Sequence, residues 1–222
     1  MTQSFTVFPH PATETRPRKP SRAVRQSALV DRAFETAADA LRESRRRLQP
    51  GILEAAQVMV RCFAAGNKVL VCGNGGSAAD AQHFAAELVG RFKSAQRPAL
   101  PVIALTADTS ILTAWANDAG YELVFARQVE ALGRPGDLLV AISTSGRSPN
   151  VIRALDAARR QGLHAVTLLG GDGGEALPLA DTALVVPSRD SQRVQEIQML
   201  VLHTICELIE DALEPSRGAL LV

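Results

Sequence analysis

The sequence is poor in several features that mark common classes of protein. Aromatic residues make up only 4% of the 222 residues, too few for the base-stacking surfaces that bind single-stranded nucleic acids. The net charge is +1, which argues against binding nucleic acid through overall charge. No apolar run approaches the roughly 18 residues that span a membrane, and no segment has the pattern of a secretory signal. We therefore expect neither a nucleic-acid partner nor a membrane partner.

Cysteine is also scarce. The three cysteines, Cys62, Cys72 and Cys206, are far apart and lie in apolar segments. They form no C-x-x-C pair, so neither a disulfide framework nor a cysteine-built zinc site is expected. This usage predicts a protein of the reducing cytoplasm.

Charge is distributed unevenly along the chain. Residues 1–50 contain ten lysines and arginines against five acidic residues, whereas residues 51–222 are net acidic. Four prolines interrupt residues 1–27, and the basic residues among them repel one another. We expect residues 1–27 to be a disordered basic tail and residues 28–215 to form one domain.

Two amphipathic helices are expected after the tail. Phe34, Leu41 and Leu48 recur every seven residues in a pattern that a Pro-Gly pair at 50–51 ends. A second helical pattern covers residues 52–65. Because no strand separates these helices, their apolar faces must pack against the domain that follows or against another subunit.

Short apolar segments alternate with helical patterns in the rest of the chain. These segments are apolar on both faces, as are the strands of parallel sheets that helices cover on each side. The alternation predicts a three-layer, doubly wound α/β sandwich. The expected strands are 69–72, 102–105, 138–142, 165–169 and 183–186, and the expected helices are about 77–92, 109–132 (in two pieces), 149–161 and 192–213.

The loop after the first expected strand is rich in glycine. Ligands of open α/β sheets bind beyond the carboxyl ends of the strands, and this loop is Gly73-Asn74-Gly75-Gly76-Ser77. Its glycines let the backbone approach a ligand, and the helix N-terminus that follows favours an anion. The loop also fits the dinucleotide fingerprint loosely, but the acid expected about 20 residues later is missing, which disfavours a nicotinamide or flavin site.

The loop after the third expected strand is rich in hydroxyls. It is Ser143-Thr144-Ser145-Gly146-Arg147-Ser148, directly before a helix that begins near residue 149. Hydroxyls and backbone amides at a helix N-terminus can fill the acceptor oxygens of a phosphate. An ordinary polar turn with Ser148 as the N-cap would need only one hydroxyl. The four hydroxyls therefore favour phosphate binding.

Polar residues within the expected helices indicate a second kind of site. His83 and Glu87 are four residues apart and share one helix face, as in helical metal sites. Gln195 and His203 lie eight residues apart, which separates them by about 12 Å along a helix axis. The four side chains are acceptable zinc ligands and could also perform acid–base chemistry. Because of the offset, we expect either Gln195 or His203 to serve a site on a neighbouring subunit.

Together and in this order, the motifs resemble the phosphoheptose isomerases of the sugar isomerase (SIS) domain family. The resemblance covers about residues 31–213 and rests on the two loops, on Gln82–Leu88, on Asn117-Asp118, and on Arg193–Ile197 with His203. It implies a five-stranded parallel sheet, N-terminal helices at an oligomer interface, and a homotetramer with active sites between subunits.

The resemblance also implies an activity. It is the conversion of sedoheptulose 7-phosphate to D-glycero-D-manno-heptose 7-phosphate, for the heptose of lipopolysaccharide and other surface polysaccharides. The residues matching Glu87 and His203 are the acid–base pair around an enediol-type intermediate; we expect Glu87 to be the base at carbon, with the two roles interchangeable. One zinc ion per subunit is implied, and the residues that match its ligands are His83, Glu87, Gln195 and His203.

The substrate is implied to lie against both loops. In the family, the residues that hold the phosphate match Ser143, Thr144, Ser145 and Ser148, and those that line the sugar match Asn74, Gly75, Gly76, Asn117 and Asp118. We also expect substrate contacts from Ser77, Glu87 and Gln195. One departure from the family pattern is Gln192, which stands where some isomerases have an acid.

Other functions are open at this point. The replication-initiator-associating proteins share the fold and most loops but bind a protein partner; they have a small residue at the position of Glu87 and an amide at that of His203. A non-catalytic sensor of a sugar phosphate and an isomerase or etherase of an amino-sugar phosphate are further alternatives. The two ionisable groups kept here favour the phosphoheptose isomerase.

Overall fold

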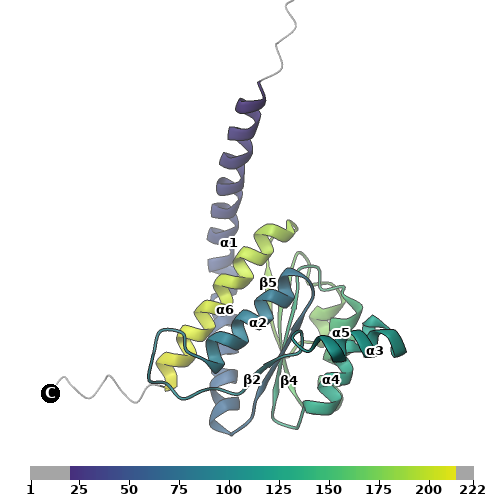
Figure 1. Ribbon diagram of the computed structural model, residues 1–222. Coiled ribbons are helices and arrows are strands. Elements are labelled where there is room, and N and C mark those ends of the chain that lie inside the picture. The colour runs from purple at the N-terminus through teal and green to yellow at the C-terminus, as the bar shows by residue number, and fades with distance from the viewer. Residues whose placement is uncertain (1–20, 214–222) are drawn as a thin grey trace, which may run out of the picture. The chain divides into compact units, whose positions relative to one another are not determined.

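The structure is a computed structural model that describes residues 21–213 (Figure 1). The chain divides into two units, residues 1–35 and residues 36–222. In the first unit the described residues are helical from Arg22, and the second contains the sheet. In chain order the elements are α1 (Arg22–Ala64), β1 (Val69–Gly73), α2 (Gly76–Val89), β2 (Val102–Ala104), α3 (Thr109–Ala119), the 3-10 helix η1 (Tyr121–Leu123), α4 (Val124–Leu132), β3 (Leu138–Ser143), α5 (Pro149–Arg160), β4 (His164–Gly170), the 3-10 helix η2 (Gly174–Leu179), β5 (Thr182–Val186) and α6 (Ser191–Leu213).

Helix α1 is continuous, and this corrects the prediction of two helices that separate at residues 50–51. A proline inside a helix removes one backbone hydrogen bond and crowds the preceding turn. Packing against the sheet outweighs that cost here. Gly51 lies so close to β5 that a Cβ at this position would come 2.6 Å from Leu184 Cδ2, and Ala55 and Ala56 are buried in the next turn.

The start of α1 also differs from the prediction. The helix begins at Arg22, inside the predicted tail of residues 1–27, and residues 1–20 lie outside the described part of the chain. Of the three members of the seven-residue repeat, Leu48 is 4% exposed, Leu41 is 42% exposed and Phe34 is 74% exposed. The predicted apolar face of this helix is therefore only partly covered within one chain.

The five strands form one parallel sheet in the order β2-β1-β3-β4-β5. Strands β1, β3 and β4 are almost wholly buried, which explains their continuous apolar sequences. The chain runs from β1 out to β2 and then returns past β1 to β3, so the direction of winding reverses between β1 and β3. In sheets of this order, ligands bind in the crevice at the carboxyl ends of those two strands.

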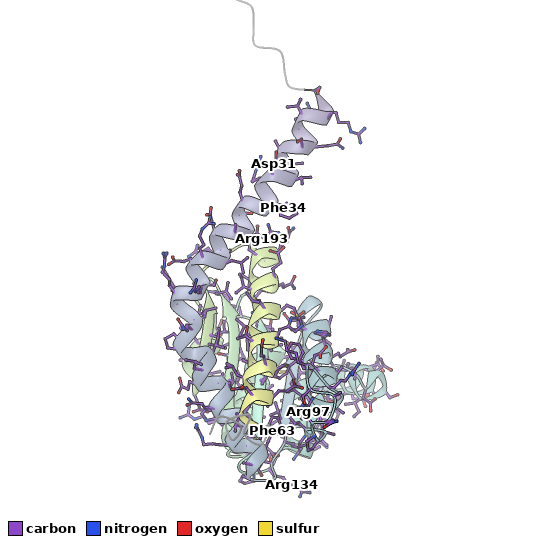
Figure 2. All side chains as sticks on the ribbon, turned by 90° about the vertical axis from the view of Figure 1, so that its left-hand side faces the viewer. Asp31, Phe34, Phe63, Arg97, Arg134 and Arg193 are labelled. Atoms are coloured by element: carbon purple, nitrogen blue, oxygen red, sulfur yellow. The ribbon has the colours of Figure 1, made fainter. Side chains whose placement is uncertain are left out.

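Helices cover both faces of the sheet (Figure 1). One buried cluster joins α1, α2 and α6 to the first face and includes Phe84 and Val201; Phe63 packs against it (Figure 2). A second cluster joins α4 and α5 to the opposite face and includes Phe125 and Leu155. The predicted three-layer α/β sandwich with a five-stranded parallel sheet is confirmed.

The three cysteines, Cys62, Cys72 and Cys206, are free and buried. Burial raises the pKa of Cys62 to about 11 and those of Cys72 and Cys206 to about 12. At neutral pH these thiols are therefore protonated and poorly reactive. Within residues 21–213, no helix combines the length and the apolar character needed to cross a membrane.

Candidate functional site

The glycine-rich loop after β1 brings the start of α2 against α6. Gly75 has φ +54°, a left-handed conformation that favours glycine, and it stands directly before the helix. Gly76 opens α2 so close to α6 that a Cβ on it would come 2.3 Å from Gln195 Nε2. Ser77, in the first turn of α2, is buried. The loop thus places Gln195 at the N-terminus of α2, where Ser77 and the first backbone N–H groups lie.

The hydroxyl-rich loop after β3 is folded on its own side chains. Ser143 Oγ accepts a hydrogen bond from the Gly146 N–H at 3.1 Å and lies 3.2 Å from Ser148 Oγ. Gly146 has φ +64°, and a Cβ on it would come 1.9 Å from Gly173 O. Only glycine fits this position, so the loop is held compact immediately before α5.

The hydroxyl of Ser148 does not act as a helix cap. Ser148 occupies the N-cap position of α5, yet its side chain accepts no hydrogen bond from the backbone of the helix. Thr144 and Ser145 line a cavity of about 300 Å³, together with Arg147 and Arg189. Asp172 also lines this cavity and pairs with Arg147 at 2.8 Å, which leaves Arg189 as the guanidinium without this carboxylate partner. The four predicted phosphate-binding hydroxyls therefore belong to one loop at a helix N-terminus, an arrangement suited to an anion.

A pair of asparagines joins the two loops. Asn74 and Asn150 exchange two amide hydrogen bonds of 2.8 Å each. Asn150 is only 2% exposed, and the hydroxyl of Tyr121 donates to Asn74 Oδ1 at 3.2 Å. The Asn74 side chain, predicted to line the sugar, thus has a structural role that fixes the crevice between β1 and β3.

Asn117 and Asp118 lie in the last turn of α3, within the range 109–132 that was expected to be helical in two pieces. Asn117 Nδ2 donates to Asp118 Oδ1 at 2.9 Å, and both residues are exposed. Apart from this mutual bond, within residues 21–213 neither side chain forms a hydrogen bond with a predicted site residue. Gly120 ends the helix with φ +101°, and the next residue, Tyr121, reaches Asn74. The segment therefore borders the crevice through Tyr121.

The predicted acid–base residues meet where α2 packs beside α6 (Figure 1). His83 Nε2 lies 2.9 Å from His203 Nε2, across 120 residues of sequence, and the two rings meet edge to face at 5.1 Å. Glu87 Oε1 lies 3.5 Å from His83 Nε2. His83 therefore stands between the carboxylate and the second imidazole, and all three side chains keep access to solvent.

The surroundings of this histidine cluster are both buried and acidic. Burial raises the pKa of Asp80, one helical turn before His83, and nearby His83 partly offsets the rise. The raised pKa of Cys206 has burial as its main cause, followed by the charges of Glu87 and Glu210. Asp80 was absent from the sequence-based set of site residues. Asp80 could have been identified from the sequence, because its spacing of three residues places it on the same helix face as His83.

The donor set for a metal is present only in part within one chain. His83, His203 and Glu87 approach one another in the pairs given above, and imidazole and carboxylate suit zinc. Gln195 lies at Gly76, about two turns of α6 away from His203, as its eight-residue spacing predicted. Among residues 21–213, no group of three or more His, Cys, Asp or Glu has the geometry to hold a metal ion.

Several residues that shape the site gave little signal in the sequence. Asn150 and Tyr121 act through contacts with residues distant along the chain, as do Arg97 and Glu210 in the clamp described below. Gln192, which stands where some isomerases have an acid, is exposed in the first turn of α6. Its backbone N–H donates to Asp190 Oδ1 at 3.0 Å, so a carboxylate does lie beside this position.

Comparison with known proteins gives consistent results. The sequence model of the SIS domain matches residues 33–170. A phosphoheptose isomerase of Helicobacter pylori (strain P12) is 49% identical over 182 residues, which cover 82% of this chain and 94% of the relative. A phosphoheptose isomerase of Aliarcobacter butzleri (strain RM4018) is 56% identical over 166 residues, which cover 75% of this chain and 87% of the relative.

A solved structure agrees with these relatives. The structure of a phosphoheptose isomerase from Francisella tularensis superposes with a TM-score of 0.82 and 39% identity, covering 84% of this chain and 98% of that chain. Both the sequence and the fold therefore match over most of each protein. The chain belongs to the phosphoheptose isomerase family of SIS-domain proteins.

Proposed function

We propose that the protein is an aldose–ketose isomerase that converts sedoheptulose 7-phosphate to D-glycero-D-manno-heptose 7-phosphate. One observation carries the proposal: His83 Nε2 lies 2.9 Å from His203 Nε2 and 3.5 Å from Glu87 Oε1. Two helices that are distant in sequence thereby hold a carboxylate and an imidazole at one place. The relatives named phosphoheptose isomerase, at about half identity, support the choice of substrate.

The reaction needs two proton movements, one at carbon and one at oxygen. Glu87 removes the proton from C1 of the ketose, which leaves an enediol-type intermediate, and returns a proton to C2. His203 moves the proton between O1 and O2. General acid–base catalysis of this kind accelerates a reaction by about 10²- to 10⁴-fold. A carboxylate suits the first task because its oxygen can take the proton as a general base without attacking the sugar carbon.

The phosphate of the substrate binds at the hydroxyl-rich loop in this proposal. Ser143, Thr144, Ser145 and Ser148 supply hydroxyl groups, and the start of α5 supplies backbone N–H groups. Binding a remote, unreactive phosphate orients the reacting end of the sugar, and this lowers the barrier at C1 and C2.

A zinc ion is part of the proposal. Among residues 21–213 of one chain, His83, Glu87 and His203 lack the geometry to hold the ion by themselves. In the proposal they hold it only when Gln195 from a neighbouring subunit completes the set, because within one chain Gln195 lies at Gly76 instead. A bound zinc ion would act as a Lewis acid toward the oxyanion that develops at the sugar oxygens.

The proposal also includes a homotetramer with active sites between subunits. An apolar groove of about 330 Å³ separates α1 from α6, and its lining includes Leu41, Leu48, Ile52, Leu200, Val201 and Leu208. Leu41 is 42% exposed and Leu200 is 50% exposed, and burial of such side chains favours association. In addition, Ser77 and Glu87 stand at opposite ends of α2, about 15 Å apart. That separation supports a site in which the loop and the acid–base pair come from different subunits.

A cytoplasmic location and a role in surface polysaccharide synthesis complete the proposal. The free thiols of Cys62, Cys72 and Cys206 support a reducing compartment.

The proposed activity is tested by incubating the full-length protein with sedoheptulose 7-phosphate and following the aldose product by proton NMR. We expect turnover, with the aldose and the ketose approaching a fixed ratio. Light scattering on the same sample should give the mass of four chains. No aldose, either with or without added zinc, would contradict the proposed activity.

A further inference from the structure

The side chain of Arg97 is buried at the end of α2. It is only 2% exposed. Its Nη1 donates to Leu88 O at 2.8 Å and its Nη2 donates to Glu87 O at 2.9 Å. The last carbonyls of a helix have no partner within the helix, so the guanidinium group occupies a place that a helix cap would otherwise fill. Arg97 therefore holds the backbone of Glu87 directly.

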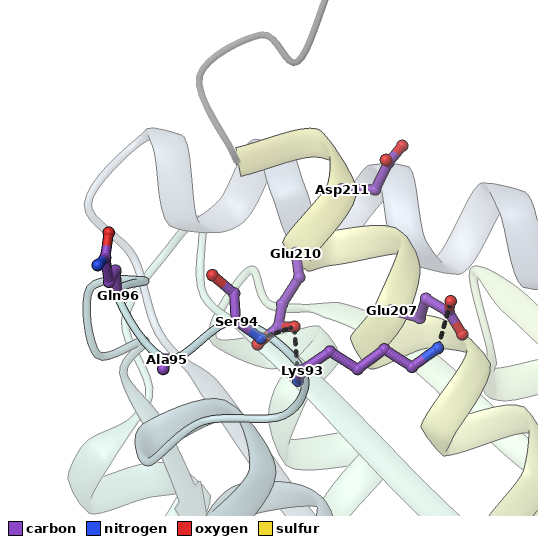
Figure 3. Close-up of a pocket in the computed structure, with 7 residues that line it drawn as sticks. All are labelled: Lys93, Ser94, Ala95, Gln96, Glu207, Glu210 and Asp211. Atoms are coloured by element: carbon purple, nitrogen blue, oxygen red, sulfur yellow. Dashed lines mark hydrogen bonds and ion pairs between the residues drawn. The ribbon is translucent and has the colours of Figure 1, made fainter.

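The carboxylate of Glu210 completes a clamp between α2 and α6 by pairing with Arg97. Figure 3 shows Glu210 reaching from α6 to the loop that contains Lys93 and Ser94. Glu210, on α6, accepts from Arg97 Nε at 2.9 Å. It also accepts from the backbone N–H groups of Phe92 at 3.0 Å, Lys93 at 2.8 Å and Ser94 at 2.9 Å. Burial raises the pKa of Glu210, but Arg97 and the three N–H groups outweigh it and hold the pKa below its ordinary value. The carboxylate is therefore ionised at neutral pH.

This clamp is linked to both members of the acid–base pair, to Glu87 through its backbone carbonyl and to His203 through the ring of Phe92. Arg97 holds the carbonyl of Glu87, as described above. Glu210 holds the backbone of Phe92, whose ring stacks on the imidazole of His203 with a centroid distance of 5.6 Å and an interplanar angle of 29°. A single ion pair thus links the backbone of the carboxylate residue to the ring that supports the imidazole.

We propose that the Arg97–Glu210 ion pair is a positioning device for the isomerisation, which sets the placement of Glu87 relative to His203. This role rests on the proposed function. Neither residue touches the reacting atoms; both act through others. A displacement of about 1 Å at a catalytic group can cost on the order of 100-fold in rate. Within residues 21–213 neither clamp residue forms a hydrogen bond with the hydroxyl-rich loop that binds the phosphate in the proposal, so loss of the clamp should spare substrate binding.

Two conservative substitutions test the proposal. In Arg97→Lys, one ammonium group cannot reach Glu210 and the two helix carbonyls together, because it lacks the fork of donors. In Glu210→Gln, the amide nitrogen faces backbone N–H groups that need an acceptor. We expect each variant to lower kcat for sedoheptulose 7-phosphate by about 10- to 100-fold, with KM changed by less than about threefold.

A second ion pair beside the clamp provides a matched control. Lys93 and Glu207 form an ion pair of 2.5 Å between the same loop and the same helix (Figure 3), but their side chains are 62% and 56% exposed. Because an exposed pair contributes little, Glu207→Gln should leave kcat unchanged; Lys93 is kept because its Nζ lies 5.9 Å from the centroid of the Phe92 ring. Near-ultraviolet circular dichroism and thermal melting establish that each variant is folded.

The outcomes separate the clamp from the activity. Suppose that the unaltered protein has turnover and that the folded clamp variants keep its full kcat, with or without a change in KM. The positioning role is then wrong, and the isomerase activity stands. If the unaltered protein has no turnover, the proposed function fails and this role fails with it. Should both clamp variants fail to fold, Phe92→Leu keeps the ion pair but removes the ring from His203. It should lower kcat severalfold without a change in KM, and an unchanged kcat would overturn the proposal.

Discussion

The two parts of the candidate site are built in different ways. The hydroxyl-rich loop, proposed to bind the phosphate, is one contiguous segment in which Ser143 is hydrogen-bonded to both Gly146 and Ser148. The histidine cluster joins α2 to α6 across 120 residues and depends on packing and on a buried ion pair. The residues of the loop are therefore close together in the sequence, whereas the histidine cluster forms only when α2 and α6 pack side by side. Changes in the loop should therefore alter binding, and changes in the cluster should alter the chemical step.

The strongest test of this comparison removes the base from the cluster. Glu87→Gln keeps the size of the side chain but cannot accept the C1 proton. We expect kcat to fall by on the order of 10³-fold, whereas KM and the melting temperature change little. Steady-state kinetics measures both constants. A kcat within tenfold of the unaltered protein would show that the carboxylate is not the base.

The next largest effect should come from Gly146→Ala in the loop. The new Cβ would meet Gly173 O at 1.9 Å with φ at +64°, so the loop must shift. We expect a loss of about 3 kcal/mol in the free energy of unfolding and a large rise in KM. Gly171→Ala is a matched control, because φ is also +64° but the nearest atom, Arg189 Cγ, is 3.6 Å away. It should cost only about 1 kcal/mol, and equal losses would argue against the clash.

A smaller effect separates binding from helix capping. Ser148→Ala should raise KM by about tenfold through loss of a hydrogen bond to a charged group, with little change in stability, since the hydroxyl caps no helix. Asp108→Ala is the opposite case. The Asp108 carboxylate accepts from the Ile111 N–H at 3.0 Å at the start of α3, so its loss should cost about 1 kcal/mol of stability and leave KM unchanged. A reversal of these two patterns would contradict the assignment.

The smallest predicted effect is a difference in acid sensitivity between the two regions. The pKa of Glu210 in the folded protein lies below its ordinary value of 4.5. Its contribution to stability is therefore complete above pH 4.5 and is lost as the pH falls through the lower value. Hydrogen exchange should show falling protection of the Phe92, Lys93 and Ser94 amides over that range, after correction for intrinsic rates. The Gly146 amide, bonded to a neutral hydroxyl, should show no such change, and a matching change there would remove the distinction.

The sequence predicted the fold closely because periodicity and burial agree. The strands fall within one or two residues of their expected positions, since β1, β3 and β4 are apolar on both faces. The prediction was wrong at Pro50, where a local stop signal was outweighed by the close packing of Gly51 on Leu184. A local rule cannot include a contact that forms across more than a hundred residues.

The candidate site was predictable to the extent that it follows local patterns. The spacing of His83 and Glu87 predicted a shared helix face, and the spacing of Gln195 and His203 predicted their separation along α6. Asn150 gave no such signal, because its role arises from an amide pair with Asn74. Arg97 and Glu210 are likewise defined by contacts that only the folded chain creates.

The central claim is that the cluster performs proton transfer at carbon while the loop binds the phosphate. Isomerisation in D₂O tests it most directly, because a proton removed from C1 and returned to C2 exchanges with the solvent at the base. We expect NMR to show deuterium at C2 of the aldose made by the unaltered protein. Ser148→Ala should incorporate deuterium at the same position, at a lower rate that is explained by its weaker binding of the substrate. Glu87→Gln should bind the sugar phosphate with near-normal affinity and incorporate almost no deuterium. Incorporation by Glu87→Gln at the rate of the unaltered protein would contradict the account.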